Sequence, residues 1–378
     1  MLLIWSVICC IVSLIMSIET ILGLRSMVSL DRVIVTRHDF PTLSIIITAC
    51  NEESTITETL EKLCTQDYQN LEIICVNDRS TDNTKKLMDQ FAQQHSHIRI
   101  VDIQVLPAGW LGKNYAAQQG ANAAVGEWLL FMDADALLDK NTLKKVVQYA
   151  IEKKLDHIAV LPHYICKGFL YNVVNVFYRG HGLVTSLKPW LAKSKRSKKS
   201  FNLGLFCLVK SSVYRAIGGH QAIANNPVED VAFGKLVKKA GYCPEVLNAQ
   251  NSIQIEWYPT LRKMVQGLEK NCFAYFRYKI IYVIGAIVAL WFLLLFPVIA
   301  CFITSGIIFY LNMLSVLLML MMYIEVTKTF QSPKIYALFY PAGLIVHTFT
   351  LCNSVLHFIK NKGIVWRGTF YSAEMLKK

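Results

Sequence analysis

The pattern of apolar and polar residues divides the chain into three parts. Residues 2–24 are almost uniformly apolar, and long apolar runs return over residues 282–303, 307–324 and, more weakly, 337–359. From Pro41 onward, short apolar runs alternate with amphipathic stretches. This alternation is typical of an α/β sheet domain, whereas the long runs have the length of membrane-spanning helices. The pattern therefore predicts an α/β domain with one N-terminal and two to three C-terminal transmembrane helices.

Basic residues follow the first apolar run, and none precedes it. Arg25, Arg32 and Arg37 lie just after it, and basic residues favour the cytosolic side of a membrane. We expect an uncleaved anchor whose N-terminus lies outside and which leads into a cytosolic domain. A cleaved signal peptide is the alternative, but it would need a positively charged start and a small-residue cleavage site.

The last apolar run is the least regular of the expected spans. Three C-terminal spans would leave the basic segment 360–378 outside, against the tendency of basic residues to stay inside. Pro341, His347 and Asn353 also interrupt this run. A re-entrant or interfacial segment is therefore an alternative to a third span.

In the central part, the spacing of apolar residues predicts alternating strands and helices. Thr55 and Glu58 have the spacing of a capping box at the start of one helix. The predicted strands are 43–48, 71–76, 98–101, the apolar run that begins at Glu127, 203–209 and 252–256. The predicted helices are 55–66, one that ends near Gln94, 114–124, one that begins near Asn141, 228–241 and 260–276.

Polar clusters fall at several predicted strand ends. They are Asn51-Glu52-Glu53, Asp78-Arg79-Ser80, Gly112-Lys113-Asn114 and Asp133-Ala134-Asp135. Ligands of open parallel sheets bind outside the carboxyl ends of the strands, because loops and helix N-termini with free backbone donors meet there. We therefore expect the four clusters to lie close together.

Asp133 and Asp135 end the apolar run EWLLFM with two carboxylates separated by one alanine. In an extended segment, residues i and i+2 point to the same side. Both carboxylates could then bind one hard cation, Mg²⁺ or Mn²⁺, and with it a diphosphate. The alternative is a loop that only caps the helix beginning near Asn141.

Residues 168–191 are apolar and aromatic, but Arg179, His181 and Lys188 make them a poor membrane span. We consider an interfacial segment on the membrane and an ordinary core helix with a loop as equal alternatives. The basic run Lys193 to Lys199 follows directly. It is either a solvated loop or a segment attracted to anionic membrane lipids.

Composition narrows the class of protein. Of the 378 residues, 54% are hydrophobic, which is too apolar for an ordinary soluble domain of this size. The 39 Lys and Arg against 26 Asp and Glu give a net charge of +13. No zinc-finger spacing or long basic run indicates a nucleic-acid partner. The 11 cysteines form no C-x-x-C pair and are typical of buried small hydrophobic residues in a reducing compartment.

Five motifs occur in order along the chain: T-A-C-N-E-E, N-D-R-S, G-K-N, D-A-D and V-E-D. In this order and spacing they resemble the inverting family 2 glycosyltransferases of GT-A fold, a Rossmann-like fold, over residues 43–271. The flanking spans, the G-W-L-G-K-N-Y-A block and Trp366-Arg367-Gly368 with Tyr371 are most similar to membrane enzymes that glycosylate carotenoid acids.

The resemblance implies a division into four parts. Residues 1–25 would be the membrane anchor, and residues 41–277 the GT-A domain, with an interfacial acceptor segment over 168–200. Residues 278–360 would form the C-terminal membrane helices, and residues 361–378 a basic tail.

The resemblance also implies roles for single residues. Asn51 and Glu52 would lie at the nucleotide, Asp78 would bind the uracil, and Lys113 would approach the nucleotide or diphosphate. Asp133 and Asp135 would hold the sugar diphosphate and the metal, Asp230 would be the catalytic base, and Glu229 would be secondary. The alternative for the last two is stabilisation of a helix N-terminus, at about 0.3–1 kcal/mol each.

Three departures from the family pattern bear on function. Thr48 stands where a proline is usual, Asn77 replaces the first loop aspartate, and the Q-x-x-R-W motif of processive synthases is absent. The absence of that motif favours transfer of a single sugar, although Arg262, Gln266 and Lys270 could take over the role of that helix.

We expect transfer of one sugar, from UDP-glucose, to an apolar lipid-like acceptor such as a carotenoid acid. Polyprenyl phosphate and glycolipid acceptors are alternatives, and a non-catalytic membrane binding protein on the same fold is the alternative from another class. A carboxylic acid acceptor is already ionised near neutral pH, so it would not need Asp230 as a base.

Overall fold

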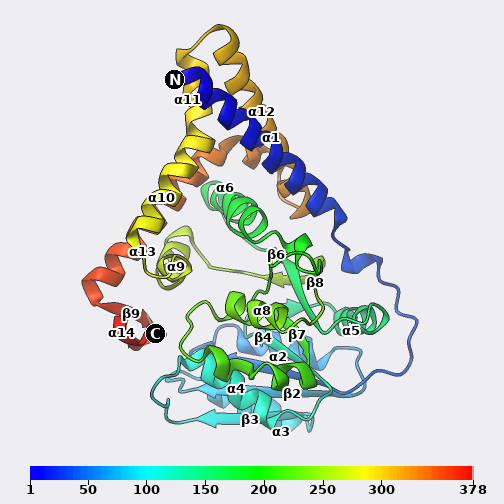
Figure 1. Cartoon of the computed structure of the whole chain (residues 1–378). Coiled ribbons are helices and arrows are strands. Elements are labelled where there is room, and N and C mark those ends of the chain that lie inside the picture. Colours follow the sequence, from blue (N-terminus) through cyan, green and yellow to red (C-terminus); the bar gives the residue numbers. More distant parts are fainter. Residues whose placement is uncertain (377–378) are drawn as a thin grey trace.

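The computed structural model of the protein describes residues 1–376. Figure 1 shows an α/β domain on which a group of long helices stands. One eight-stranded sheet organises this domain, in the order β3-β2-β1-β4-β7-β6-β8-β5. The predicted α/β domain with apolar helices at both ends of the sequence is confirmed.

The first half of the sheet is parallel. Every residue of β1 is buried, because helices cover both faces of the sheet. Thr48 of β1 pairs in register with Val76 of β2 and Asp133 of β4, so the carboxyl ends of these three strands are level. The elements are β1 (Leu43–Ala49), α2 (Ile56–Cys64), β2 (Leu71–Asp78), α3 (Thr84–Gln94), β3 (Ile98–Ile103), α4 (Gly112–Ala123) and β4 (Trp128–Asp133).

The second half of the sheet is mixed. Strand β7 pairs antiparallel with both β4 and β6, and β8 runs parallel to β6. The elements are β5 (Ala136–Leu138), α5 (Thr142–Glu152), β6 (His157–Tyr164), β7 (Phe206–Lys210), α7 (Ser211–Ala216), α8 (Glu229–Lys239) and β8 (Pro244–Ile255).

Four helices are long and apolar enough to cross a membrane. They are α1 (Leu2–Ser26), the continuous helix Ile280–Ile303, α12 (Gly306–Thr329) and the helix Lys334–Asn361. The second comprises α10 (Ile280–Leu290), a π-helical turn and α11 (Phe296–Ile303), and the fourth includes α13 (Tyr340–Asn361). The fourth has the lowest mean hydropathy, 1.5.

Small and polar residues hold α1 against α12. The side chain of Ser17 donates to the carbonyl of Leu318 at 2.8 Å, and the amide of Asn312 donates to Ser6 at 2.8 Å. Small side chains at such an interface let helices approach closely where water contributes no hydrophobic driving force. The pair therefore packs through hydrogen bonds rather than through large apolar side chains.

Segment 168–200 lies between the sheet and the long helices. It forms α6 (Phe169–Phe177), a π-helical turn over Tyr178–Thr185 and a short 3-10 turn. Val174 and Arg179 are buried, whereas Phe169 and Leu170 are about half exposed. Helix α9 (Leu261–Tyr275) follows β8 and also lies below the long helices.

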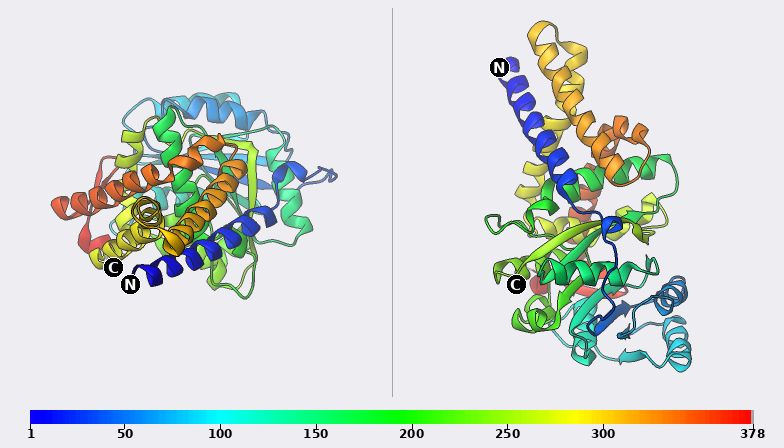
Figure 2. Two further views of the ribbon diagram at one scale, coloured as in Figure 1. Left: turned by 90° about the horizontal axis from the view of Figure 1, so that it is seen from above. Right: turned by 90° about the vertical axis from the view of Figure 1, so that its right-hand side faces the viewer.

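Both ends of α13 lie at the α/β domain. Before it, Gln331 donates to Asn251 of β8 at 2.7 Å. Just after it, the chain forms the hairpin β9 (Gly363–Trp366) and β10 (Thr369–Ser372), followed by α14 (Ala373–Leu376). Seen from above in Figure 2, α13, in orange to red, runs from the end of α12 to the C-terminal hairpin. The C-terminal segment expected as a basic tail is therefore folded as far as residue 376.

Several local expectations were wrong or incomplete. Thr55 is the N-cap of α2, but its side chain makes no capping hydrogen bond and contacts Glu52 instead. Strand β6 was not predicted, and only the end of β8 was. Strand β7 begins at Phe206 rather than at residue 203. Polar residues and Pro162 interrupt the apolar pattern of these strands.

Helix α13 lies very close to α6 at Gly343. A Cβ added there would lie 2.4 Å from the Cβ of Phe177 on α6, whereas one added at Gly285 of α10 would meet nothing within 4 Å. We expect Gly343→Ala to lower the free energy of unfolding in detergent by about 1–3 kcal/mol through overpacking. Gly285→Ala is the matched control and should be neutral or stabilising. Equal stability of the two variants would show that α13 does not pack on α6 in this way.

Candidate functional site

One cavity of about 970 Å³ lies between the carboxyl ends of the strands and the long helices. The expected residues that line it come from the loop after β1, the start of α4, the end of β4 and the start of α8. They are Glu52, Lys113, Asp133, Asp135, Glu229 and Asp230. Four of these residues, Glu52, Lys113, Asp133 and Asp135, belong to the strand-end clusters, so the predicted convergence is confirmed for them. Asn51 and Asp78 lie outside the cavity wall.

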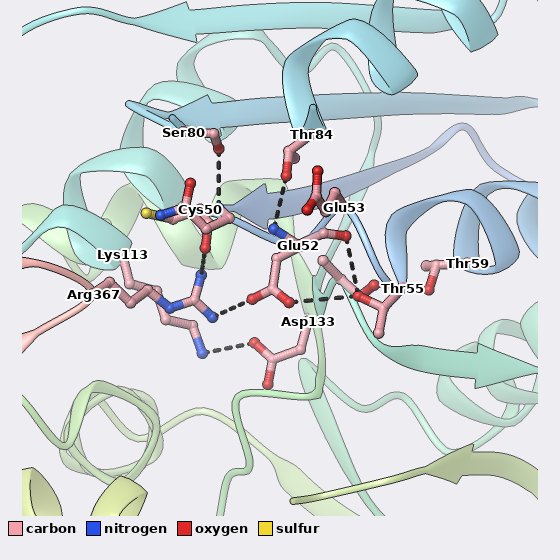
Figure 3. Close-up of polar contacts among 12 residues, drawn as sticks. Cys50, Glu52, Glu53, Thr55, Thr59, Ser80, Thr84, Lys113, Asp133 and Arg367 are labelled. Carbon is pink, nitrogen blue, oxygen red and sulfur yellow. Dashed lines mark hydrogen bonds and ion pairs between the residues drawn. The ribbon is translucent and has the colours of Figure 1, made fainter. Parts of the chain in front are cut away.

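Lys113 joins two acidic residues that are far apart in sequence. It is the second residue of α4, and its Nζ lies 2.7 Å from Asp133 Oδ1 and 3.0 Å from Glu229 Oε1. Figure 3 shows its side chain directed towards Asp133. Burial opposes the charge of the lysine, but the two carboxylates outweigh it and raise the pKa of Lys113. The ammonium group thus carries a permanent positive charge in the cavity wall.

The neighbours Glu229 and Asp230 differ in their environment. Burial favours the neutral form of Glu229, but Lys113 outweighs it and lowers the pKa of that carboxyl. Asp230 has no cation within ion-pair distance in the described chain; its carboxylate accepts from the backbone N–H groups of Gly204 at 3.3 Å and Val231 at 2.7 Å. Burial, and then the charge of Glu229, raise the pKa of Asp230 to about 6.

Asp135 lies in a tight turn between β4 and β5, so the expectation that an extended strand holds both aspartates was wrong. The carboxylates still gather. Burial, and then Asp133 and Glu52, raise the pKa of Asp135 to about 7. The crowding of these carboxylates at the end of β4 is the electrostatic feature that the sequence predicted.

The loops after β1 and β2 are tied to each other. Asn51 has a positive φ of 58°, and its side-chain oxygen accepts from the backbone N–H of Thr81 at 2.8 Å. Asp78 is buried and pairs with Arg79 at 2.8 Å. Gly112 lies so close that a Cβ there would be 2.4 Å from Asp78 Oδ2, which explains the glycine at the start of α4. These contacts fix the loops in front of the cavity.

Sequence reasoning did not identify several cavity residues. Arg179 is 2% exposed and donates to Ser332 at 3.1 Å, yet its Nε has no partner in the described chain. Tyr164, at the end of the unpredicted strand β6, lines the same cavity. Lys270 was named only as a possible substitute for a missing motif, and Arg367 only as part of a resemblance. Tertiary packing brings these four side chains to the cavity, and a local sequence pattern does not reveal such packing.

The far end of the cavity is apolar. Leu183 and Leu187 line it from the segment after α6, Ala286 and Leu290 from α10, and Leu351 from α13. The cavity therefore runs from a cluster of charged side chains to helices that are apolar enough for lipid. Such an arrangement can accommodate one ligand with a charged part and another with an apolar part.

The acidic residues fit a divalent cation that is shared with a ligand. Asp133 Oδ2 accepts no hydrogen bond from the described chain, and Asp135 lies beside it in a cluster of like charges. No group of three or more acidic, His or Cys side chains within residues 1–376 is arranged to hold a metal by itself. Mg²⁺ and Mn²⁺ sites of this kind use one or two carboxylates and take the remaining ligands from substrate phosphates and water.

Comparison with known proteins identifies the domain. Residues 44–217 match the family described as "Glycosyl transferase family 2". The 4,4'-diaponeurosporenoate glycosyltransferase of Staphylococcus haemolyticus is 25% identical over 234 residues, which are 61% of this chain and 60% of that protein. Beta-monoglucosyldiacylglycerol synthase of Synechocystis sp. is 28% identical over 158 residues, 41% of this chain and 32% of that protein.

A solved structure has the same overall fold. The mannosyltransferase of Pyrobaculum calidifontis, in complex with GDP-Man and Mn²⁺, superposes with a TM-score of 0.50 at 15% identity, over 96% of this chain and 98% of that one. The predicted family and GT-A fold are thereby confirmed. The matches to the two relatives above span no more than about three fifths of the length of either.

Proposed function

We propose that this chain, which carries a glycosyl transferase family 2 domain, transfers one sugar from a nucleoside-diphosphate sugar to a lipid-like acceptor with inversion. One observation carries the proposal: a single cavity joins the acidic cluster at the strand ends to the apolar helices α10 and α13. A charged donor and an apolar acceptor would meet inside it.

The residues at the charged end of the cavity and in the loops beside it would bind the donor. Asn51 and Glu52 would contact the nucleotide, Asp78 the base, and Lys113 the diphosphate. Asp133 and Asp135 would hold Mg²⁺ or Mn²⁺, which when bound neutralises charge on the leaving diphosphate. The Mn²⁺ and GDP-Man in the solved mannosyltransferase support this class of donor and metal.

With a hydroxyl acceptor, Asp230 would act as the general base. Its carboxylate lies at the cavity wall without a neutralising cation, and its raised pKa suits proton transfer near neutral pH. It would take the proton of an acceptor hydroxyl that attacks the anomeric carbon from the face opposite the diphosphate. Glu229 is paired with Lys113 and would position that lysine.

We expect the acceptor to enter from the membrane past α10 and the segment after α6. The names of the relatives support two acceptors: a carotenoid acid, as in diaponeurosporenoate, and a diacylglycerol lipid. We favour the carotenoid acid with UDP-glucose as donor, because those relatives align over the larger share of the chain. Polyprenyl phosphate is a further alternative within the same reaction class.

The membrane arrangement follows from the two ends of α13. If α1, Ile280–Ile303 and α12 cross the membrane and α13 lies at its surface, the domain and the C-terminus share one side. The basic residues after α1 support a cytosolic location for that side. In this arrangement only two C-terminal helices cross the membrane, so the basic segment 360–378 stays on the cytosolic side, as basic residues tend to do.

Release of nucleoside diphosphate tests the proposed function. We expect purified protein in lipid to release UDP from UDP-glucose only with divalent metal and a suitable acceptor, among carotenoid-acid, diacylglycerol and polyprenyl phosphate preparations. Asp135→Ala should lower the rate by about 100-fold or more, because several kcal/mol of charge stabilisation are lost. Asp139→Ala, at an exposed aspartate nearby, is the control. Absence of release from UDP-, GDP- and other nucleotide sugars would instead support a non-catalytic binding protein.

The pH dependence of the rate tests Asp230. A base must be deprotonated, so with a hydroxyl acceptor the rate should fall as the pH falls through about 6. Asp230→Asn should then reduce kcat by about 10²–10⁴-fold and abolish this acidic limb. With a carotenoid acid, the ionised acceptor needs no base, and Asp230→Asn should retain activity with a flat profile. Complete loss of turnover with a carboxylic acid acceptor would contradict that reading.

Labelling of inserted tags tests the topology. A tag after Ser305, between α11 and α12, should be accessible on intact cells, because this turn lies at the end of the helices away from the domain in Figure 1. A C-terminal tag and one after Gly109 in the α/β domain should be accessible only after permeabilisation. A C-terminal tag that is labelled on intact cells would show that α13 crosses the membrane.

A further inference from the structure

The C-terminal hairpin reaches the front of the catalytic cavity. Its turn consists of Arg367 and Gly368, both with positive φ, at 48° and 78°. This backbone is the two-residue hairpin turn that matches the twist of paired strands. A two-stranded hairpin is marginal by itself, so its position depends on what it contacts.

The hairpin contacts three of the four strand-end clusters, or the residue next to them. Arg367 pairs with Glu52 at 2.6 Å and donates to the carbonyl of Cys50 at 3.3 Å. Thr369 accepts from Arg79 at 3.4 Å, and the hydroxyl of Tyr371 accepts from the backbone N–H of Gly112 at 3.0 Å. Figure 3 shows the Arg367 guanidinium beside Glu52 and next to Lys113. Segments at opposite ends of the chain therefore form one surface.

The hairpin also covers a partly buried lysine. Nζ of Lys270 on α9 lies 3.4 Å from the ring centre of Trp366. No carboxylate lies within ion-pair distance of this ammonium among residues 1–376. Lys113, Lys270 and Arg367 all line the cavity. Three cations thus face the region that the proposed function assigns to the diphosphate.

Arg367 is the most available of the cations beside Glu52. Lys113 is held by two carboxylates, and Arg79 is held by the buried Asp78. The Arg367 side chain is 38% exposed and has a single ion-pair partner. Ion pairs that water reaches are weak, whereas a guanidinium binds phosphate oxygens with two parallel hydrogen bonds.

We propose that the C-terminal hairpin is a strap over the donor site, and that Arg367 exchanges Glu52 for the diphosphate of the bound nucleotide sugar. Thr369 and Tyr371 anchor the strap, and Trp366 holds Lys270 beside the same diphosphate. The inference rests on the proposed function and assigns the donor diphosphate to residues outside the matched family region, 44–217. The C-terminus is thereby part of the donor site.

Binding of nucleotides to the full-length protein tests the strap. Titration calorimetry would compare UDP and UMP, and GDP and GMP, in the presence of Mg²⁺ and again with chelator. Arg367→Ala should weaken diphosphate binding by about 10- to 100-fold, the usual worth of a charged hydrogen bond, and change monophosphate binding much less. Arg215→Ala, at an exposed arginine on α7 outside the cavity wall, is the matched control. Arg367→Lys should recover part of the affinity.

A second variant separates direct contact from neutralisation of Glu52. If the guanidinium contacts the diphosphate, adding Arg367→Ala to a Glu52→Gln variant should weaken diphosphate binding further. No further effect in that background, equal loss of mono- and diphosphate, or unchanged affinity of Arg367→Ala would overturn the inference. If native protein binds no nucleoside diphosphate, the proposed function itself fails. The melting temperature without nucleotide would show whether each variant is folded.

Discussion

Charge balance at the ends of the parallel strands is the constraint on which this structure depends. Glu52, Asp133 and Asp135 converge because β1 and β4 end at the same level, and Glu229 approaches them from α8. Carboxylates this close would repel one another without cations. Lys113 bridges Asp133 and Glu229, and Arg367 reaches Glu52 from the far end of the sequence. A segment that follows the last long helix therefore supplies part of the positive charge that balances the carboxylates of the α/β domain.

This constraint links the domain to the membrane helices. The hairpin can reach Glu52 only if α13 returns the chain to the side of the domain. Gln331 and Asn251 fix the start of that return, and Gly343 brings α13 against Phe177 of α6. Helix α13 and the segment that follows α6 also line the apolar end of the cavity. The charged and apolar ends of one cavity are thus positioned by a single set of packed elements.

The sequence predicted what depends on local pattern. The apolar run before Asp133 and the polar clusters at the strand ends led to the sheet and to four cavity residues, since periodicity and strand polarity are local properties. Glu229 and Asp230 were expected from the family resemblance. Strand β6 was missed because His157, Pro162 and His163 break its apolar run. The capping box at Thr55 was wrong because Glu52 competes for the hydroxyl. Arg367 and Arg179 depend on contacts more than 150 residues away in sequence, which a pattern cannot report.

The contrast between Glu229 and Asp230 shows how packing, rather than residue type, separates the pKa values of two adjacent carboxyl groups. Both are carboxylates at the start of α8, and burial raises the pKa of both in the absence of other charges. Lys113 lies 3.0 Å from Glu229 and holds it ionised, and that fixed negative charge in turn raises the pKa of Asp230. One lysine on α4 therefore separates two adjacent acids into one that stays ionised and one, the proposed base, whose pKa is raised. Pairs of titratable groups whose pKa values are pushed apart in this way are characteristic of acid–base sites, so the electrostatics favour Asp230 over Glu229 independently of any family resemblance.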